Sequence, residues 1–426
     1  MARRVAIVTG CRTPFARAGS ELGRMSPVQL GTVAVRELLN RAEIDPAEID
    51  HLIFGTVIPS ILAPNVAREV AIESGLPPSV PSFTVSRACA SSNQAITSGA
   101  EMILNGHADV VVAGGVEVLS DVPMLLSRSL RDALLSASKA KSMGARMKAL
   151  ARVRPKHFAP ITPAIAEPST GETMGESAER MAKENGISRE AQDRWALRSH
   201  RLAAQGTADG RLKAEIVPTF VPPAYEKVLD HDNGVRTDTS GEKLAALRPV
   251  FDKRYGTVTA ANASPLTDGA SAVLLMSEEK AKALGLEPLG YIRSWAYSAL
   301  SPRAQLLQGP AYATPVALDR AGMTMNDVEL WEMHEAFAAQ VLSNLEALDS
   351  AEFARTELGR DRKVGLIDEG RINVMGGSIA LGHPFGATGA RLTTTLLNEM
   401  GRRDAGIGLI TVCAAGAMGF AMVVER

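Results

Sequence analysis

Short apolar runs alternate with longer amphipathic stretches along the whole chain. The apolar runs include VAIVTG at 5–10, DVVVAGG at 109–115 and GLITVC at 408–413. Runs of this length, bounded by turn residues, are typical of buried strands. Helical stretches lie between them, such as SSNQAITSGAEMIL at 91–104. This alternation of strands and helices predicts an α/β fold.

The pattern of elements occurs twice. Residues 37–55 align with residues 316–334 at an offset of 279, and both contain a helix end at Arg-Ala, a short loop, an acidic capping turn and a strand. The helix expected at about 90–105 and the strand after it resemble the helix at about 387–400 and its following strand. Few positions are identical, but in a chain of 426 residues the repeat predicts two similar α/β halves.

The region between the halves differs from both, because it is rich in turn residues. We therefore expect three parts: an N-terminal half (1–119 with 250–276), an insertion subdomain (120–249) and a C-terminal half (277–426). Within the insertion, residues 128–156 carry nine Lys or Arg and one Asp. A solvated helical face is the simplest interpretation, and the alternatives are a surface for phosphates, for a membrane or for a partner subunit.

The composition is that of a globular protein, with 46% hydrophobic and 22% charged residues and a mean hydropathy of +0.02. A net charge of −1 gives no overall attraction to nucleic acid or to an anionic membrane. Three cysteines in so long a chain argue against a disulfide framework and for a reducing compartment, which we expect to be the cytoplasm. The N-terminal residues show neither a signal-peptide nor a transit-peptide pattern.

One segment has the length of a membrane anchor. Between Asp404 and Glu425 lie 20 uncharged residues. No basic cluster flanks them, and four glycines would weaken a helix there: Gly406, Gly408, Gly416 and Gly419. We therefore expect two buried strands joined by the turn AAGAM, and no transmembrane segment.

Cys89 lies between the strand-like PSFTVSRA and a helical run. This placement predicts a strand-to-helix turn, where the sulfur is exposed much as in a nucleophile elbow. The partial positive charge at the helix end favours thiolate over thiol. A cysteine in such a place can also be only a small buried residue.

Two further residues suggest chemistry at a thiol. His383 lies in the loop GHPFGATGAR, whose glycines let the backbone approach a ligand closely. Cys413 ends an apolar strand and precedes small residues that leave room and free backbone N–H groups. The alternatives are a phosphate-binding loop or plain turn for His383 and a core cysteine for Cys413. A nucleophilic thiolate, a base and a second thiol that shuttles protons together suit carbon–carbon cleavage or formation next to a thioester.

Two more polar segments are candidates. His334 begins HEAFAAQV after the strand-like VELWEM, and Glu335 beside it could orient a polar group; the alternative is a helix-capping turn. Residues 262–274, NASPLTDGASAVL, form a polar turn before a strand and either line a pocket or are only a loop.

These motifs together resemble those of the thiolases. The matching segments are SRACASSNQA, NASPLTDGAS, HEAFAAQ, GHPFGATGAR and the C-terminal CAAG, and similar features run from VAIVTGCRTPF to AMVVER. The chain most resembles the thiolase β subunits of fatty-acid oxidation multienzyme complexes and their bacterial anaerobic-type relatives. His334 points there, since most other thiolases have Asn before Glu-Ala-Phe, and so does CAAG in place of Cys-x-Gly-Gly.

The resemblance implies a fold and an activity. The fold would be two βαβαβαββ halves in a five-layered α/β/α/β/α core, with the insertion over the active site. The activity would be acetyl-CoA C-acyltransferase (3-ketoacyl-CoA thiolase) of fatty-acid β-oxidation, with ping-pong kinetics through an acyl group on Cys89. His383 would take the proton of Cys89. Cys413 would protonate the leaving acetyl-CoA enolate and then deprotonate the incoming CoA.

The resemblance also implies binding residues. One oxyanion site would use His383 with His334, and the other the backbone N–H groups of Cys89 and Ala415. Five positions match coenzyme A contacts of the family: Met174, Arg236, Ser264, Ala336 and Phe337. Coenzyme A is then a substrate, and neither a bound cofactor nor a metal is expected. Ala417 stands where relatives usually have Gly, which would narrow the pocket.

The expected partners are acyl-CoA and CoA, a second copy in a homodimer or homotetramer, and a hydratase/dehydrogenase α subunit; nucleic acid is not expected. Residues 128–156 match the insertion that meets a partner subunit or a membrane in complex-forming relatives. Acetyl-CoA acetyltransferase (acetoacetyl-CoA thiolase) is the alternative within the same chemistry. A non-catalytic lipid or CoA carrier would lack one of Cys89, His383 or Cys413. Acyl-carrier-protein ketosynthases, which typically use two histidines without a second cysteine, are disfavoured by Cys413.

Overall fold

The computed structural model describes residues 3–161 and 165–426. The chain forms two compact units, one made of residues 1–120 with 166–426 and the other of residues 121–165. Each unit is described by itself below. The three-part division with boundaries at 120, 250 and 277 stays a prediction.

The larger unit is built on an extended mixed sheet with the strand order β10-β11-β12-β9-β1-β8-β5-β3-β4. Its N-terminal strands are β1 (Val5–Arg12), β3 (His51–Gly55), β4 (Ser82–Val85), β5 (Val110–Glu117) and β8 (Thr267–Ser277), and the short β2 (Ala16–Arg17) pairs with β8. Its C-terminal strands are β9 (Gly290–Ala299), β10 (Leu330–Met333), β11 (Ile407–Ala414) and β12 (Met418–Glu425).

The two parts of the sheet have matching topology. In the first, β3 is parallel to β4 and β5, and β8 is antiparallel to both β5 and β1. In the second, β10 is parallel to β11, and β12 is antiparallel to both β11 and β9. The parts join where residues 5–7 of β1 pair with residues 290–292 of β9.

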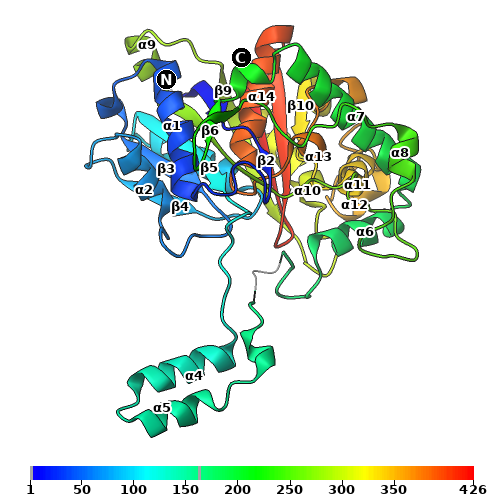
Figure 1. Cartoon of the computed structure of the whole chain (residues 1–426). Coiled ribbons are helices and arrows are strands. Elements are labelled where there is room, and N and C mark those ends of the chain that lie inside the picture. The colour runs from blue at the N-terminus through cyan, green and yellow to red at the C-terminus, as the bar shows by residue number, and fades with distance from the viewer. Residues whose placement is uncertain (1–2, 162–164) are drawn as a thin grey trace. The chain divides into compact units, whose positions relative to one another are not determined.

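Helices and strands form five layers, and three of the apolar clusters hold these layers together (Figure 1). The first core packs α1 (Pro27–Ala42) and α2 (Val66–Glu73) on one face of the N-terminal strands. The central core contains α3 (Ser91–Leu104) and α14 (Thr388–Arg403) between the inner faces of both parts. The third packs α10 (Gly309–Ala321) and α11 (Ala338–Leu348) on the outer face of the C-terminal strands. The expected α/β/α/β/α core is confirmed.

The predicted internal repeat is also visible in the element boundaries. Helix α1 and strand β3 are joined through the 3₁₀ helix η1 (Pro46–Glu48), and α10 and β10 are joined through η4 (Met325–Asp327). The start of η4 lies 279 residues after the start of η1, which is the offset found in the sequence. Each half also places a central helix before its next strand, α3 before β5 and α14 before β11.

The C-terminal apolar segment forms the two buried strands that the sequence predicts. Strands β11 and β12 pair as a hairpin in which Cys413 is opposite Gly419. Among the residues that the structure describes, none of the helices combines the length and the apolar character needed to cross a membrane.

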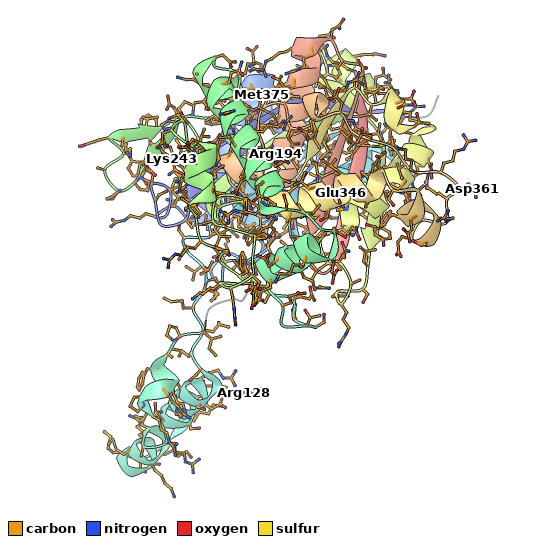
Figure 2. All side chains as sticks on the ribbon, turned by 90° about the vertical axis from the view of Figure 1, so that its right-hand side faces the viewer. Arg128, Arg194, Lys243, Glu346, Asp361 and Met375 are labelled. Atoms are coloured by element: carbon orange, nitrogen blue, oxygen red, sulfur yellow. The ribbon has the colours of Figure 1, made fainter. Side chains whose placement is uncertain are left out.

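The remaining elements of the larger unit are the long helix α7, several shorter helices and one small hairpin. They are α6 (Met174–Glu184), α7 (Arg189–Ala208), α8 (Gly241–Ala245), α9 (Glu278–Ala283), α12 (Ala351–Thr356), α13 (Ser378–Leu381), η3 (Lys213–Glu215), η5 (Glu369–Arg371), β6 (Thr219–Val221) and β7 (Lys227–Leu229). Figure 2 labels Arg194 on α7 and Lys243 on α8.

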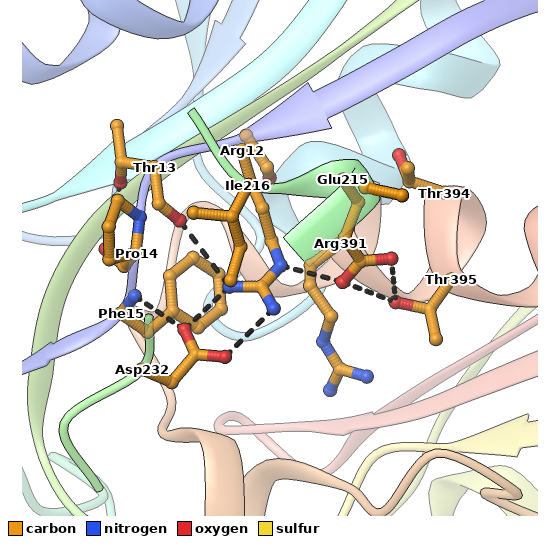
Figure 3. Close-up of polar contacts among 12 residues, drawn as sticks. Arg12, Thr13, Pro14, Phe15, Glu215, Ile216, Asp232, Arg391, Thr394 and Thr395 are labelled. Atoms are coloured by element: carbon orange, nitrogen blue, oxygen red, sulfur yellow. Dashed lines mark hydrogen bonds and ion pairs between the residues drawn. The ribbon is translucent and has the colours of Figure 1, made fainter. Parts of the chain in front are cut away.

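A buried cluster of charged side chains connects Glu215 and Asp232 to strand β1 of the sheet (Figure 3). Arg12 of β1 donates from Nη1 and Nη2 to the two carboxylate oxygens of Asp232, at 2.6 and 2.8 Å. Its Nε donates to Glu215 Oε1 at 2.7 Å, and the Glu215 carboxylate also accepts from Thr395 Oγ1 of α14. Because the three charged side chains are buried, each requires its partners to offset the cost of desolvation.

The smaller unit is a pair of helices, α4 (Arg128–Lys139) and α5 (Met143–Leu150), followed by the 3₁₀ helix η2 (Pro155–Phe158). Arg128 at its first helical position is labelled in Figure 2. The basic segment at 128–156 is therefore largely helical, as expected. Several large apolar side chains of the smaller unit are exposed, among them Leu135, Met143, Met147 and Phe158.

Candidate active site

Cys89 lies in the predicted turn between strand β4 and helix α3. Ala88 before it has a φ of 46°, a left-handed conformation that is uncommon for a residue with a side chain. Ser91 supports this turn, because its Oγ accepts from the Arg87 N–H at 2.8 Å and donates to the Ala88 carbonyl at 2.7 Å. Strain held by neighbouring hydrogen bonds is a common feature of functional turns.

His383 meets Cys89 from the loop that joins α13 to α14. Its Nε2 lies 3.1 Å from Cys89 Sγ. Its Nδ1 lies 2.6 Å from Thr388 Oγ1, and the Thr388 hydroxyl donates to the Pro384 carbonyl. Since that hydroxyl has only one proton to donate, it accepts from His383 Nδ1–H. Nε2 is then the unprotonated nitrogen, and its lone pair faces the thiol.

Close backbone packing makes this meeting possible. Gly382, directly before His383, has a φ of 108°, which favours glycine. At Gly389, at the start of α14, an added Cβ would lie 2.1 Å from Asn93 Oδ1 of α3. The glycines of the GHPFGATG loop therefore let the two central helices approach with Cys89 and His383 near their N-terminal ends.

His334 completes a cluster of three potential donor atoms. It follows β10, and its ring centroid lies 4.1 Å from that of His383. One ligand atom each from Cys89, His334 and His383 lies within 4.8 Å of the others. His334 Nδ1 lies 2.9 Å from Ser378 Oγ, while Nε2 is buried and has no hydrogen-bond partner among the described residues.

A buried ion pair supports His334 from behind. Arg391 donates from Nη2 to Ser378 Oγ and from Nη1 to Glu332 Oε2, both at 3.0 Å. Both charged side chains are almost completely buried. Ser378 Oγ therefore connects this ion pair to the imidazole, with its own proton still free to point toward Nδ1.

Cys413 and the turn after it form another wall of the site. Cys413 is fully buried at the end of β11. The backbone N–H groups of Ala415 and of Cys89 itself point at the Cys89 sulfur. Gly416 and Ala417 both have positive φ, of 83° and 55°, so this turn is tight.

Burial leaves the Cys89–His383 pair uncharged at rest. Desolvation raises the pKa of the Cys89 thiol to about 12, although the N–H groups of Ala415 and Cys89 act in the opposite direction. The residue as a whole is partly exposed, but protein surrounds its sulfur. Desolvation, together with the charge of Arg391, lowers the pKa of His383 to about 3. The thiolate that we expect from the helix end is therefore not the resting form, because desolvation outweighs the helix-end effect.

Burial acts on the other two groups in the same way. Desolvation and the nearby Cys89 raise the pKa of Cys413 well above its usual value. Desolvation, His383 and Arg391 lower the pKa of His334 well below its usual value. Each of the four groups is therefore neutral near pH 7, and a charge must develop during the reaction.

Three of the five expected coenzyme A positions share an apolar cluster with Cys413, and a fourth is hydrogen-bonded to one of them. Met174, Ala336 and Phe337 belong to the same apolar cluster as Cys413. Ser264 joins them through its backbone, because its N–H donates to the Ala336 carbonyl at 2.9 Å.

Arg236 is the fifth expected position. It is exposed, its backbone N–H donates to His200 Nδ1 of α7, and it acts electrostatically on Arg17. Arg17 is a second cation at this place that the sequence interpretation missed.

Three buried carboxylates also shape the site, and only Glu335 has a sequence-based interpretation. Glu335 accepts from Trp195 Nε1, Ser199 Oγ, Asn373 Nδ2 and the Ile379 N–H, so it orients α13 and thereby Ser378. Glu117 accepts from the Gly386 N–H at 2.9 Å and from the N–H groups of Val57 and Ile58, which holds the His383 loop. Glu167 Oε2 accepts from the Gly416 N–H at 3.0 Å.

The sequence interpretation missed Glu117 and Glu167, and only one of them is marked by its sequence context. Glu117 ends the apolar strand VVVAGGVE, where an acidic residue is unusual and therefore informative. Glu167 lies in a polar loop and has no such signal.

Comparisons with known proteins identify the family to which this site belongs. A model of the thiolase N-terminal domain matches residues 5–279, and a model of the thiolase C-terminal domain matches residues 286–426. A 3-ketoacyl-CoA thiolase of Pectobacterium atrosepticum is 51% identical over 99% of this chain and 96% of its own length. A 3-ketoacyl-CoA thiolase of Vibrio cholerae is 50% identical over 99% of this chain and 97% of its own.

One solved structure gives the comparison in three dimensions. The acetyl-CoA acetyltransferase of Bacillus anthracis superimposes with a TM-score of 0.85 at 34% sequence identity. The match covers 100% of this chain and 99% of the other.

Proposed function

The chain belongs to the thiolase family, and from this premise we propose that it is a 3-ketoacyl-CoA thiolase. It cleaves 3-ketoacyl-CoA with CoA and gives acetyl-CoA and a shortened acyl-CoA. The observation that carries the proposal is the contact of 3.1 Å between Cys89 Sγ and His383 Nε2, with the Ala415 N–H at the same sulfur and Cys413 beside it. The curated relatives at about 50% identity carry the same activity in their names.

The first half-reaction uses Cys89 as nucleophile and His383 as base. Sγ attacks the 3-keto carbon while its proton passes to His383 Nε2, so an imidazolium forms only as the bond to carbon forms. The C2–C3 bond then breaks, and its electron pair goes to C2 of the leaving acetyl-CoA enolate. The Cys413 thiol gives C2 its proton. The products of this half are acetyl-CoA and an acyl thioester on Cys89.

The second half-reaction reverses these roles. The Cys413 thiolate takes the proton of the incoming CoA thiol, and the CoA sulfur attacks the acyl carbon on Cys89. Cys89 leaves as a thiolate and regains its proton from His383. The cycle is ping-pong, and every group returns to its neutral state.

Two sets of donors stabilise the developing oxyanions. The Cys89 and Ala415 N–H groups surround the sulfur, and are thus placed for the oxygen of the acyl group attached to it. When the Ser378 hydroxyl donates to His334 Nδ1, the proton of the ring is on Nε2, which would then donate to the thioester oxygen. Protonated His383 would be the second donor to the same oxygen. The unpartnered Nε2 of His334 supports this role.

Coenzyme A binds along the wall next to Cys413. Met174, Ser264, Ala336 and Phe337 provide apolar and backbone contacts for the pantetheine part. Arg236, which is exposed, and Arg17, which is half-buried, form a cationic site that suits the phosphates or the adenine ring.

The physiological setting follows from the family. We place the protein in the cytoplasm, acting in fatty-acid β-oxidation as a homodimer or homotetramer. Association with a hydratase/dehydrogenase α subunit belongs to the same proposal, and a native mass measured with and without cell extract would reveal it.

A thiolysis assay tests the activity. The purified chain is given 3-ketoacyl-CoAs of increasing chain length with CoA, and the loss of ketoacyl absorbance is followed. Cleavage of medium or long chains supports the proposal. Activity restricted to acetoacetyl-CoA would favour acetyl-CoA acetyltransferase instead. No activity at any length would overturn the proposal in favour of the carrier hypothesis.

A further inference from the structure

The sulfur and nitrogen atoms at the centre of the site are of the types that ligate metal ions in proteins. One thiol sulfur and two imidazole nitrogens lie within 4.8 Å of one another, from Cys89, His334 and His383. Three protein ligands with one open position are the usual arrangement of zinc sites that also bind a further molecule. The sulfur is the donor that distinguishes this set from a site for Mg²⁺ or Ca²⁺, which prefer oxygen.

Both imidazoles are held by their other nitrogen. His383 Nδ1 contacts Thr388 Oγ1 at 2.6 Å, and His334 Nδ1 contacts Ser378 Oγ at 2.9 Å. In metal centres the ligating histidine usually donates its second N–H to such a neighbour, which fixes the ring and leaves the first nitrogen free. The Ser378 hydroxyl has acceptor capacity for Nδ1–H, so His334 can present an Nε2 lone pair as well as an N–H.

The third observation is that His334 Nε2 is buried without a partner among the described residues. His334 is completely buried, and a polar atom in such a place normally has a hydrogen bond or a ligand. Cys89 Sγ and His383 Nε2 already contact each other at 3.1 Å, and the ligand atom of His334 lies within 4.8 Å of both, so adjustment of the side chains suffices for one ion to reach all three.

We propose that Cys89, His334 and His383 form a reversible binding site for one thiophilic divalent cation, for which Zn²⁺ is the probe. Binding replaces the Cys89 Sγ proton with the metal, and the proton leaves to the buffer. Water takes the fourth position. The cation occupies the nucleophile, the base and an oxyanion donor at once, and it therefore excludes acyl-CoA.

The proposed inhibition rests on the proposed function, but metal binding itself does not. The holoprotein is first freed of metal with a chelator and kept reduced with a phosphine. Zn²⁺ is then titrated by calorimetry, and Co²⁺ is used for the thiolate-to-metal charge-transfer band. We expect one site per chain, and a charge-transfer band that Zn²⁺ removes.

Chemical labelling tests the site in the unaltered protein. Zn²⁺ should slow the alkylation of Cys89 by iodoacetamide at least about tenfold, and chelator should restore the rate. Unchanged alkylation at saturating Zn²⁺ would overturn the proposal.

Variants identify the ligands. Cys89→Ser and His334→Asn should each weaken Zn²⁺ binding by more than about 100-fold, and Ser378→Ala by about tenfold, because outer partners typically contribute 10–100-fold. Circular dichroism and the melting temperature confirm that each variant is folded. Equal affinity in the wild type and in both ligand variants would overturn the assignment.

Two controls separate this site from others. His231 is an exposed histidine beside Asp230 and is the kind of residue that binds zinc adventitiously. His231→Ala and Cys413→Ala should both bind Zn²⁺ like the wild type. Loss of binding in His231→Ala would mean a surface site only, and loss in Cys413→Ala would move the site to the cysteine pair; either result overturns the proposal.

The activity assay is read separately. Binding with the expected variant pattern but without any thiolysis would leave the metal site standing and overturn the proposed function. Thiolysis that Zn²⁺ does not inhibit, with one Zn²⁺ bound, would overturn the proposed exclusion of acyl-CoA.

Discussion

His383 Nε2 lies 3.1 Å from Cys89 Sγ, although the two residues are 294 positions apart in the chain. The contact joins the turn before α3 to the loop before α14, the corresponding central helices of the two halves. The contact therefore exists only because the halves pack on each other across the central core.

The first prediction concerns pH. Because the pKa of Cys89 is raised to about 12 and that of His383 is lowered to about 3, the neutral pair persists across the ordinary pH range. We expect kcat/KM for the 3-ketoacyl substrate to be nearly flat between about pH 5 and pH 9. Protonation of His383 would lower the rate only in stronger acid.

Alkylation of Cys89 checks this prediction independently. Its rate should rise tenfold per pH unit across the same range, because the thiolate fraction stays small. A plateau above about pH 7, or a rising limb of kcat/KM centred near pH 6.5, would instead indicate a resting thiolate–imidazolium pair.

The second prediction separates the two cysteines. Cys413→Ala should still form an acyl group on Cys89 from acyl-CoA, whereas turnover should fall by about 10²–10⁴-fold, the usual contribution of general acid–base catalysis. Intact-mass measurement shows the accumulated acyl-enzyme. Cys11→Ala is the matched control, because Cys11 is a thiol of β1 buried in the first apolar core, where its Sγ donates to the Ala34 carbonyl. Normal turnover in Cys413→Ala would contradict the acid–base assignment.

The third prediction concerns Glu167. Its carboxylate holds the Gly416 N–H at 3.0 Å and so positions the neighbouring Ala415 N–H. Glu167→Ala should lower kcat about tenfold or more, leave KM nearly unchanged and slow the alkylation of Cys89, because small displacements of catalytic groups are costly. Glu167→Gln keeps an acceptor oxygen and should recover most of the activity.

Glu172→Gln is the matched control for Glu167. It is a nearby carboxylate on the same segment that pairs with Arg180 away from Gly416. An equal loss of kcat in Glu172→Gln and Glu167→Ala would show a general effect of the segment rather than positioning of the turn.

The fourth prediction concerns Ala417, whose φ of 55° is strained for a residue with a Cβ. Ala417→Gly should remove about 1–2 kcal/mol of backbone strain from the folded state. Because glycine also raises the conformational entropy of the unfolded chain, part of this gain is offset, and the free energy of unfolding should increase by about 0.5–1 kcal/mol. Thermal unfolding measures it. Ala414→Gly, at an ordinary strand position of β11, should destabilise, and a lower melting temperature for Ala417→Gly would refute the argument.

The fifth prediction concerns the buried cluster of Arg12. Asp232→Ala leaves the guanidinium without its bidentate partner and should destabilise the fold by about 3–5 kcal/mol. The urea midpoint of unfolding measures this effect. Asp209→Ala removes an exposed partner of Arg211 and should cost less than about 1 kcal/mol. Similar urea midpoints for the two variants would show that the Arg12 cluster contributes little to the stability of the fold.

The sequence by itself determined the class of fold and supplied the candidate reactive residues. Hydrophobic periodicity is a local property, so the repeat at an offset of 279 residues gave matching elements that the structure confirms. Cys89 and His383 lie in glycine- and turn-marked segments whose conformation is also largely local. The C-terminal hairpin followed from the same reasoning.

Only the tertiary structure decided the protonation states and the supporting residues. Desolvation depends on every atom around a group, so the expected helix-end thiolate at Cys89 becomes a neutral thiol with a pKa raised to about 12. Glu167 contacts Gly416 across 249 positions, and no local pattern marks such a pair. The sequence thus supplies the chemical groups, while packing sets their distances, their solvation and therefore their reactivity.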